Sequence, residues 1–314
     1  MVAVLRHKQR LPDNAIATLH RGLFGKVQFV RCSGSHVPPA SVQVAPRLHF
    51  SLPLSGSFVC HAQHADVLAD PATLLCTQAG ESFRISHPHG GDDSLVFFPS
   101  THLLDHLSER AANEGLARPR RTLIAPARAQ ILAHMLCADP ETRGDALAAD
   151  ECLLQFFEMI TLGEMEVRAS SDDPLVRKTL EYVHHTAEPL LTLKNIAAAM
   201  GVRASHLTHS FAQRTGQPLY RYVMTLKLSR ALHRVATSDV DLTDLALDLG
   251  FSSHSHFSAV FKSRYAMSPS EARTRFGGRK RARDASKPAS ESRRLEMKWR
   301  PLCAARGGLP TAAR

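Results

Sequence analysis

Within residues 1–173, which we call the front half, the side chains best suited to bind a metal are two histidines and two carboxylates that lie close together in the sequence. His87 and His89 flank a proline and are followed by Asp92 and Asp93. Imidazole nitrogens and carboxylate oxygens are common ligands of zinc. The group sits beside the turn formed by Gly90 and Gly91. We therefore expect these histidines at the surface or along a pocket, and we predict no metal and no cofactor.

The six cysteines, at positions 32, 60, 76, 137, 152 and 303, show no paired spacing. Without an export signal they are expected to be reduced thiols. Cys32, Cys60 and Cys76 leave open one alternative function, a sensor of oxidants or alkylating agents. The sequence contains no Ser-His-Asp spacing, phosphate loop or dinucleotide fingerprint. We therefore expect no enzyme activity, and a metal enzyme built on the front half stays as the second alternative.

Positive charge is concentrated in the back half of the chain. The formal net charge is +10, and residues 174–314 contain 24 lysines and arginines against 10 acidic residues. Residues 1–173 contain 15 lysines and arginines against 19 acidic residues. This asymmetry indicates that the back half meets a polyanion. Part of the excess lies in residues 277–314, where the composition predicts a disordered basic tail that is either without a role or weakly attracted to DNA.

Residues 24–98 are predicted to form β structure. Between positions 48 and 54 four apolar side chains alternate with His, Ser and Pro, and turn clusters separate further short apolar runs. Short strands at regular spacing are typical of a small barrel or sandwich, which can hold one small ligand. We predict a barrel over residues 1–100 for ligand binding or dimerisation. Its pocket is expected to be lined by His49, His61, Arg84 and His87.

Residues 101–170 are predicted to be a helical linker or dimerisation region. The segments 127–138 and 145–168 contain no helix breaker apart from one glycine and are rich in Ala, Leu and Glu. Leu153, Phe157 and Ile160 recur at helical spacing, which predicts one apolar face. The sequence leaves two uses open for this face, packing within the domain or contact with a second copy of the chain.

Residues 196–222 and 245–272 resemble each other, and each reads as a helix, a glycine turn and a second helix. The small alanines allow the two helices of each unit to approach closely, and two apolar residues at i and i+4 face inward from the second helix. This is the pattern of a helix-turn-helix, present twice. An ordinary helical bundle is the alternative. The matched positions are Ile196 and Leu245, Ala197 and Ala246, Gly201 and Gly250, Leu207 and Phe257, and Phe211 and Phe261.

The second unit closely resembles the signature of AraC-type transcription regulators. Residues 250–262 read GFSSHSHFSAVFK and are followed by Ser268-Pro269, and the first unit also fits the spacing of the family. The resemblance covers about residues 177–275. It implies a DNA-binding domain over 171–276, with helix-turn-helix subdomains at 194–215 and 242–265 joined by a long helix over about 218–235. It also implies a cupin-like front half, so the metal enzyme of the second alternative would be a cupin-fold enzyme.

The resemblance further implies the partners of the protein. They are a double-stranded DNA operator, RNA polymerase and a small-molecule inducer, and a homodimer is expected. The expected function is that of a cytoplasmic transcription regulator that binds a specific DNA sequence under the control of a small-molecule effector, and the sequence leaves open activation and repression. The first residues do not read as a signal peptide, and no apolar run reaches the roughly 18 residues of a membrane span. We therefore expect no contact with a membrane.

The inward residues of each second helix also predict which side chains point outward to DNA. Ser and Thr can hydrogen-bond base edges or phosphate, and His can donate to guanine. The family commonly has arginine in place of His209 and Ala259, and lysine in place of Ala212, so this chain lacks several charged donors. The predicted DNA contacts are Ser205, Thr208, His209, His254, Ser255, Ser258, Ala259 and Lys262.

One departure from the family predicts a packing change. The family ends the second subdomain with Ser-Pro, two residues, an aromatic residue and Arg, but this chain has Ala272 at the aromatic position. Phe276 lies four residues further on, on the same helical face. We predict that the Phe276 ring fills the gap and is buried against Leu245, Phe257 or Phe261. The alternative is a frayed helix end with Phe276 exposed.

Overall fold

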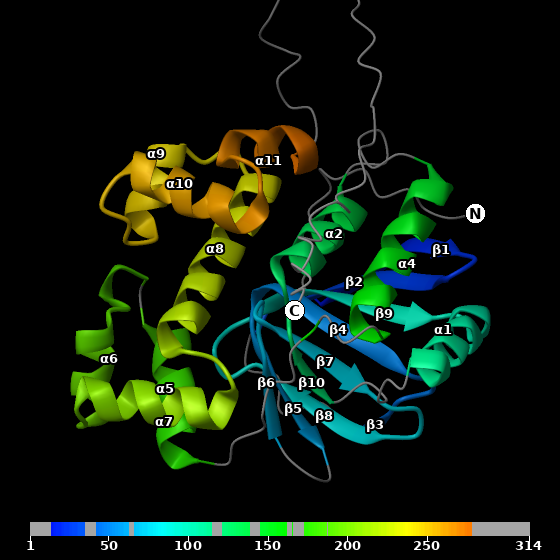
Figure 1. Cartoon of the computed structure of the whole chain (residues 1–314), viewed down its shortest axis with the longest axis horizontal. Helices are drawn as coiled ribbons and strands as arrows, with labels where there is room; N and C mark the ends of the chain where they lie inside the picture. The colour runs from blue at the N-terminus through cyan, green and yellow to red at the C-terminus, as the bar shows by residue number, and fades with distance from the viewer. Residues whose placement is uncertain are drawn as a thin grey trace, which may run out of the picture. The chain divides into compact units, whose positions relative to one another are not determined.

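The computed structural model describes residues 14–34, 42–62, 66–114, 121–138, 145–161, 165, 173–186 and 188–277 (Figure 1). Most of the predicted basic tail lies outside these ranges. Among the described residues, no helix is both long enough and apolar enough to cross a membrane. The described part of the chain combines a front half of two β-sheets with a back half of helices, as predicted.

The front half is built from a six-stranded and a four-stranded antiparallel sheet. The larger sheet has the order β1-β2-β9-β4-β7-β10 and the smaller has the order β3-β8-β5-β6. A small buried cluster of Phe58, Cys60, Val67, Ala69 and Leu75 joins the two sheets. The strands are β1 Ala15–Gly22, β2 Gly25–Cys32, β3 Gln43–Val44, β4 His49–Gly56, β5 Phe58–Ala62, β6 Asp66–Ala69, β7 Thr73–Thr77, β8 Ser82–Ser86, β9 Asp92–Pro99 and β10 Thr122–Ile124.

Two strands lie outside the predicted β region of residues 24–98. In β1 the buried residues are Ala15, Ala17 and His20, whereas Ile16 is 68% exposed. Because two of the buried residues are small and the third is polar, the strand shows no clear apolar alternation in the sequence. Strand β10 has three residues and pairs with β7, so the larger sheet extends beyond the predicted boundary at residue 100.

Among the described residues three helices accompany the larger sheet, and α2 and α4 lie over one of its faces (Figure 1). They are α1 Thr101–Glu114, α2 Ala127–Cys137 and α4 Ala146–Thr161. The apolar residues Leu153, Phe157 and Ile160 are buried in the same core as the sheet residues Phe50 and Phe97. This face is therefore used for packing within the domain. Helix α4 accounts for most of the predicted helix 145–168, and residues 162–164 and 166–168 of that prediction lie outside the described residues.

The back half consists of helices, and several of them begin or end next to residues that commonly cap helices. They are α5 Pro174–His185, the 3-10 helix η1 Glu188–Leu190, α6 Leu193–Met200, α7 Ala204–Thr215, α8 Leu219–Thr237, α9 Leu242–Asp248, α10 His254–Tyr265 and α11 Pro269–Phe276. Asp173, Thr192 and Asp241 each accept backbone N–H hydrogen bonds at a helix start. Gly201 ends α6 with φ of +67°, a conformation that favours glycine.

Helix α8 joins two helical subdomains (Figure 1). Each subdomain has its own buried cluster. The first cluster contains Leu207 and Phe211, and the second contains Phe257 and Phe261. The prediction that these residues face inward is confirmed. Phe276 is 1% exposed and belongs to the second cluster together with Leu245. The predicted burial of its ring is therefore confirmed, and the alternative of an exposed ring is wrong.

Candidate nucleic-acid interface

The second helix of each unit, α7 or α10, presents an outward face beside its buried apolar residues. Ser253 starts α10, and its hydroxyl oxygen accepts a hydrogen bond from the His256 N–H at 3.1 Å. Arg203 starts α7 without a side-chain cap. The turn before α10 contains Gly250 with φ of +74°. These caps and turns fix where each helix begins and thus which side chains its first turns present.

On α10 four of the five predicted contacts are exposed. They are His254, Ser255, Ala259 and Lys262. Ser258 is half-buried, and its Oγ lies 3.4 Å from Nε2 of His254. Lys262 is the one permanent cation among the eight predicted contacts. This face therefore offers one strong phosphate contact and several hydrogen-bonding groups.

On α7 the predicted contacts Ser205 and His209 are exposed, whereas Thr208 is half-buried. The Thr208 hydroxyl donates within the helix, with its oxygen 3.0 Å from the carbonyl oxygens of Ala204 and Ser205. Because its single hydrogen is used there, it can act toward DNA only as an acceptor. His206 is not among the predicted contacts, but it is exposed and lies three residues before His209. The spacing of three residues between His206 and His209 places both on one face of a helix, and this spacing could have added His206 to the predicted contacts.

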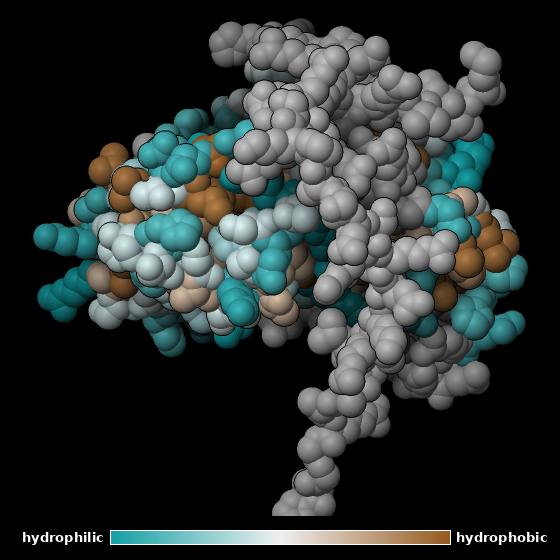
Figure 2. Space-filling view, turned by 90° about the horizontal axis from the view of Figure 1, so that it is seen from above, coloured by the Kyte–Doolittle hydropathy of each residue, from teal (hydrophilic) through white to brown (hydrophobic). Residues whose placement is uncertain are grey.

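Figure 2 views the molecule from above. The end at which α9 and α10 lie, on the left as in Figure 1, shows hydrophilic, intermediate and hydrophobic residues side by side in this view.

The barrel is joined to the first helical subdomain through a buried carboxylate, Asp70. Its Oδ1 accepts hydrogen bonds from the N–H of Ala72 and the hydroxyl of Thr73, both at 2.9 Å. Its Oδ2 accepts a hydrogen bond from the Tyr222 hydroxyl at 2.6 Å and lies 3.4 Å from Nε2 of His184. Asp70, His184 and Tyr222 are almost fully buried. This network ties a β-turn of the barrel to α5 and α8.

A second joint connects α2 to the other helical subdomain through Gln130. The Gln130 amide oxygen accepts a hydrogen bond from the Tyr265 hydroxyl at 2.8 Å, and its amide nitrogen donates to the Pro71 carbonyl at 2.6 Å. One turn further along α2, the His134 ring lies 6.0 Å from the ring of His233 and 6.1 Å from that of Phe276. Both subdomains therefore contact the front half.

Burial of His134 predicts a pH dependence of stability. Burial, with the positive charge of His233 as a lesser cause, lowers the pKa of His134 to about 3. The unfolded chain, with an ordinary histidine pKa near 6.5, therefore binds a proton that the folded chain excludes, and stability is lost as pH falls below that value. This histidine alone should cost about 1.4 kcal/mol between pH 7.5 and pH 5.5. The measurement is urea unfolding at both pH values.

The His134→Gln variant isolates that contribution. Its loss of unfolding free energy over the same pH interval should be smaller than that of the unaltered chain, whereas exposed His209→Gln should leave the loss unchanged. An equal loss in the unaltered chain and in His134→Gln would contradict this prediction.

The four predicted pocket residues lie in different surroundings. His49 is buried, with its ring 6.1 Å from that of Phe83. His61 forms an ion pair with Asp66, and Arg84 is exposed on the neighbouring strand. His87 contacts Asp92 on another side of the barrel. A cavity of about 340 Å³ instead lies between the end of β4 and helices α8 and α9, and is lined by Ser55, Gly56, Arg230, His233, Arg234, Asp248 and Leu249.

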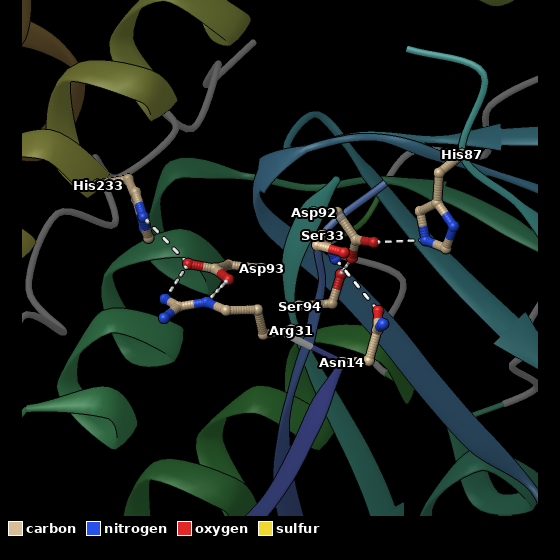
Figure 3. Close-up of polar contacts among 8 residues, drawn as sticks. All are labelled: Asn14, Arg31, Ser33, His87, Asp92, Asp93, Ser94 and His233. Carbon is tan, nitrogen blue, oxygen red and sulfur yellow. Dashed lines mark hydrogen bonds and ion pairs between the residues drawn. The ribbon is translucent and has the colours of Figure 1, made fainter. Parts of the chain in front are cut away.

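Two carboxylates, Asp92 and Asp93, lie at the start of β9, and each contacts a different basic side chain (Figure 3). Asp93 binds Arg31 through two hydrogen bonds of 2.6 and 2.7 Å and lies 3.6 Å from Nε2 of His233 on α8. Asp92 lies on the other side of the strand, 2.8 Å from Nε2 of His87. The hydrogen bond that His87 donates to Asp92, followed by its hydrogen bond with Cys32, raises the pKa of His87 to about 9.

The cysteines of the barrel core are poor candidates for a reactive thiol. Burial raises the pKa of Cys60 to about 11 and that of Cys76 to about 12. Because the thiolate is the reactive form, both remain inert thiols near neutral pH. Of the three cysteines suggested for a thiol sensor, only Cys32 is partly exposed.

Tandem helix-turn-helix units on one long helix, together with a two-sheet front half, define the class of helix-turn-helix proteins that carry an additional β domain. Comparison with known proteins gives the same division. The profile of an AraC-binding-like domain matches residues 3–162, and that of a helix-turn-helix domain matches residues 196–275. The chain belongs to the AraC family of transcription regulators.

Similar curated proteins include the HTH-type transcriptional activators RhaS. The chain is 26% identical to RhaS of Klebsiella pneumoniae over 157 residues, which is 50% of this chain and 56% of that protein. It is 29% identical to RhaS of Citrobacter koseri over 146 residues, 46% of this chain and 52% of that protein. The chain therefore matches about half the length of these relatives.

The solved structures that the chain matches include the following two. ToxT of Vibrio cholerae has 13% identity and a TM-score of 0.33, covering 82% of this chain and 100% of that chain. The C-terminal domain of AraT, a response regulator of Geobacillus stearothermophilus, has 20% identity and a TM-score of 0.34, covering 37% of this chain and 98% of that chain.

Proposed function

We propose that this protein is a transcription activator that binds a specific operator in double-stranded DNA under the control of a small-molecule effector. The observation that carries the proposal is the presence of two helix-turn-helix units with exposed second helices on one linking helix. Helix α8 has 19 residues, which corresponds to about 28 Å. One turn of DNA is about 34 Å. The spacing suits two recognition helices in successive major-groove segments on one face of the duplex.

The proposed DNA contacts are the exposed and half-exposed residues of α7 and α10. His209, His254 and Ser255 can hydrogen-bond base edges, and Lys262 can bind phosphate. Ser205, Thr208 and Ser258 add weaker polar contacts, and Ala259 offers an apolar surface to a thymine methyl group. We add His206 to this set because of its exposure on the first turn of α7.

Replacing Lys262 with alanine tests the phosphate contact. We expect weaker operator binding by the full chain, and a log–log slope of affinity against salt that is smaller by about 0.9, because one phosphate contact is lost. The measurement is a titration of labelled operator at several salt concentrations. The control is Lys26→Ala on the barrel strand β2, which should leave the slope unchanged. An unchanged slope in Lys262→Ala would contradict the assignment.

The effector is proposed to act through the front half. Candidate polar groups are His49, His61, Arg84 and His87, in their separate surroundings, and the cavity beside Gly56 offers Arg230 and Arg234. The contacts of Asp70 and Gln130 with the helical subdomains support such control, because a ligand that favours one arrangement of these contacts shifts the population. A small-molecule screen for a change in thermal stability and in operator affinity tests this. If no compound changes either property, the front half serves dimerisation only.

Further proposals follow from membership of the family. The protein would contact RNA polymerase as an activator, form a homodimer and act in the cytoplasm, where the operator lies. We propose no enzyme activity: the curated relatives are regulators, and the polar groups of the interface serve binding.

A further inference from the structure

Three side chains of types that commonly bind metals lie close together at the end of the barrel where β2 ends and β9 begins. Cys32 is the last residue of β2 and pairs with Asp92, the first residue of β9. His87 comes from the turn between β8 and β9 and points toward Asp92 (Figure 3). One ligand atom of each residue, a sulfur, a nitrogen and an oxygen, lies within 4.8 Å of the other two. Strand pairing thus brings together residues that are up to 60 positions apart.

The backbone is shaped for this close approach. A Cβ atom added at Gly91 would lie 2.0 Å from the carbonyl oxygen of Cys32. The absence of a side chain at this position therefore allows the turn that carries His87 to pack against the end of β2. Any larger residue at position 91 would push the turn, and with it the imidazole, away from Cys32.

The carboxylate of Asp92 is oriented but incompletely satisfied. Its side chain is 3% exposed, and its Oδ2 accepts a hydrogen bond from the Ser94 hydroxyl. Its Oδ1 is buried, lies 2.8 Å from His87 Nε2, and has no other partner among the described residues. By contrast, the neighbouring Asp93 has both oxygens bound by Arg31. A buried carboxylate oxygen aimed at an imidazole and a thiol is well placed to accept a cation.

We propose that Cys32, His87 and Asp92 form a binding site for a zinc ion. Thiolate, imidazole and carboxylate are the side-chain ligands that zinc takes in proteins, and three such ligands with an open fourth position form a standard set. Ser94 holds the carboxylate as an outer partner. The His87 side chain is 18% exposed and Cys32 is half-buried, so an ion can enter, and water or an anionic group can take the fourth position.

This proposal revises the expectation of no metal. His87, His89, Asp92 and Asp93 lie close together in the sequence. In the structure His89 instead packs against His184 and His185 of α5, with ring centroids 5.5 and 4.3 Å apart. Asp93 is taken by Arg31. The missing ligand is Cys32, which only the pairing of β2 with β9 reveals.

The test is metal binding by the purified full chain after removal of metals with a chelator. We expect one equivalent of Zn²⁺, measured in competition with a chromophoric chelator. With Co²⁺ as the probe we expect the absorption of a tetrahedral ion and a thiolate-to-cobalt charge-transfer band. Zn²⁺ should also protect Cys32 from alkylation, read out by peptide mass spectrometry. This last readout requires no substitution and so does not depend on the folding of a variant.

Substitutions assign the ligands. Cys32→Ser, His87→Gln and Asp92→Asn should each weaken zinc binding by about 100-fold or more, because even changes to outer partners cost up to that much. Matched controls are Cys137→Ser, His61→Gln and His89→Gln, each expected within about threefold of the unaltered chain. Circular dichroism of every metal-free variant checks that it is folded.

Several results would overturn the proposal. They are an absence of stoichiometric binding, cobalt binding without the thiolate band, and alkylation of Cys32 that zinc does not slow. Zinc binding that survives the three ligand substitutions but is lost in His89→Gln would place the ion on the histidines of α5. None of these outcomes depends on DNA binding, so the two proposals are tested separately.

Discussion

Replacing Phe276 with alanine is expected to lower the free energy of unfolding by about 3–5 kcal/mol, the usual cost of deleting a buried ring. The ring is 1% exposed and lies in the cluster that contains Leu245, Phe257 and Phe261. Ala272 lies one helical turn earlier, and its methyl group is too small to fill the space that the Phe276 ring occupies. Denaturant unfolding of the full chain measures the effect, and the exposed Tyr220→Ala serves as control, with a loss under about 1 kcal/mol.

Exchanging the residues at positions 272 and 276 tests whether stability depends on an aromatic ring in this space. Ala272→Phe alone should destabilise the protein by about 1–3 kcal/mol, because the site is already filled by Phe276. In the Phe276→Ala background the same substitution should recover part of the lost stability. A loss under about 1 kcal/mol in Phe276→Ala, or a swap that is no more stable than the worse single variant, would contradict this account.

The second large effect is expected at Asp70. Asp70→Ala should lower the free energy of unfolding by about 3–5 kcal/mol, as expected when one member of a buried ionic network is removed. The substitution removes the acceptor of Tyr222 and the charge beside His184, and it also frees the donors of the β-turn at Thr73. The matched control is Asp66→Ala, whose carboxylate is 66% exposed in its pair with His61, and which should cost under about 1 kcal/mol.

A double-mutant cycle shows whether Asp70 acts through Tyr222. Tyr222→Phe should cost about 1–3 kcal/mol, since it leaves an oxygen of Asp70 without its hydroxyl donor. The two substitutions together should cost clearly less than the sum of the single losses. Additive losses would mean that the contact between the barrel and α8 contributes nothing of its own.

The helical half of the protein was largely predictable because its signals are local. The capping side chains of Asp173, Thr192 and Asp241 and the turn glycine Gly201 lie within a few residues of the helix ends that they define. The burial of Phe276 followed from the i, i+4 spacing and the gap at Ala272. In each case the sequence distance between cause and effect is about one helical turn.

The front half was predictable as a class but not in its details. The alternation around Phe50 predicted strands, but β1 buries Ala15, Ala17 and His20 and so carries a weak apolar pattern. Strand pairing joins distant residues, and no local pattern shows that Cys32 lies opposite Asp92. For the same reason the contact of Asp70 with Tyr222 could not be predicted, because 152 residues separate them.

The central claim is tested most directly by selecting genomic DNA fragments bound by the full chain and sequencing them. We expect a small set of fragments that share one sequence, extended over two major-groove segments about 10 base pairs apart. A double variant, His209→Glu with Ser255→Glu, places a negative charge on each recognition helix and should lose these fragments while remaining folded. Recovery of fragments spread evenly over the genome, identical for the unaltered chain and the double variant, would contradict the account.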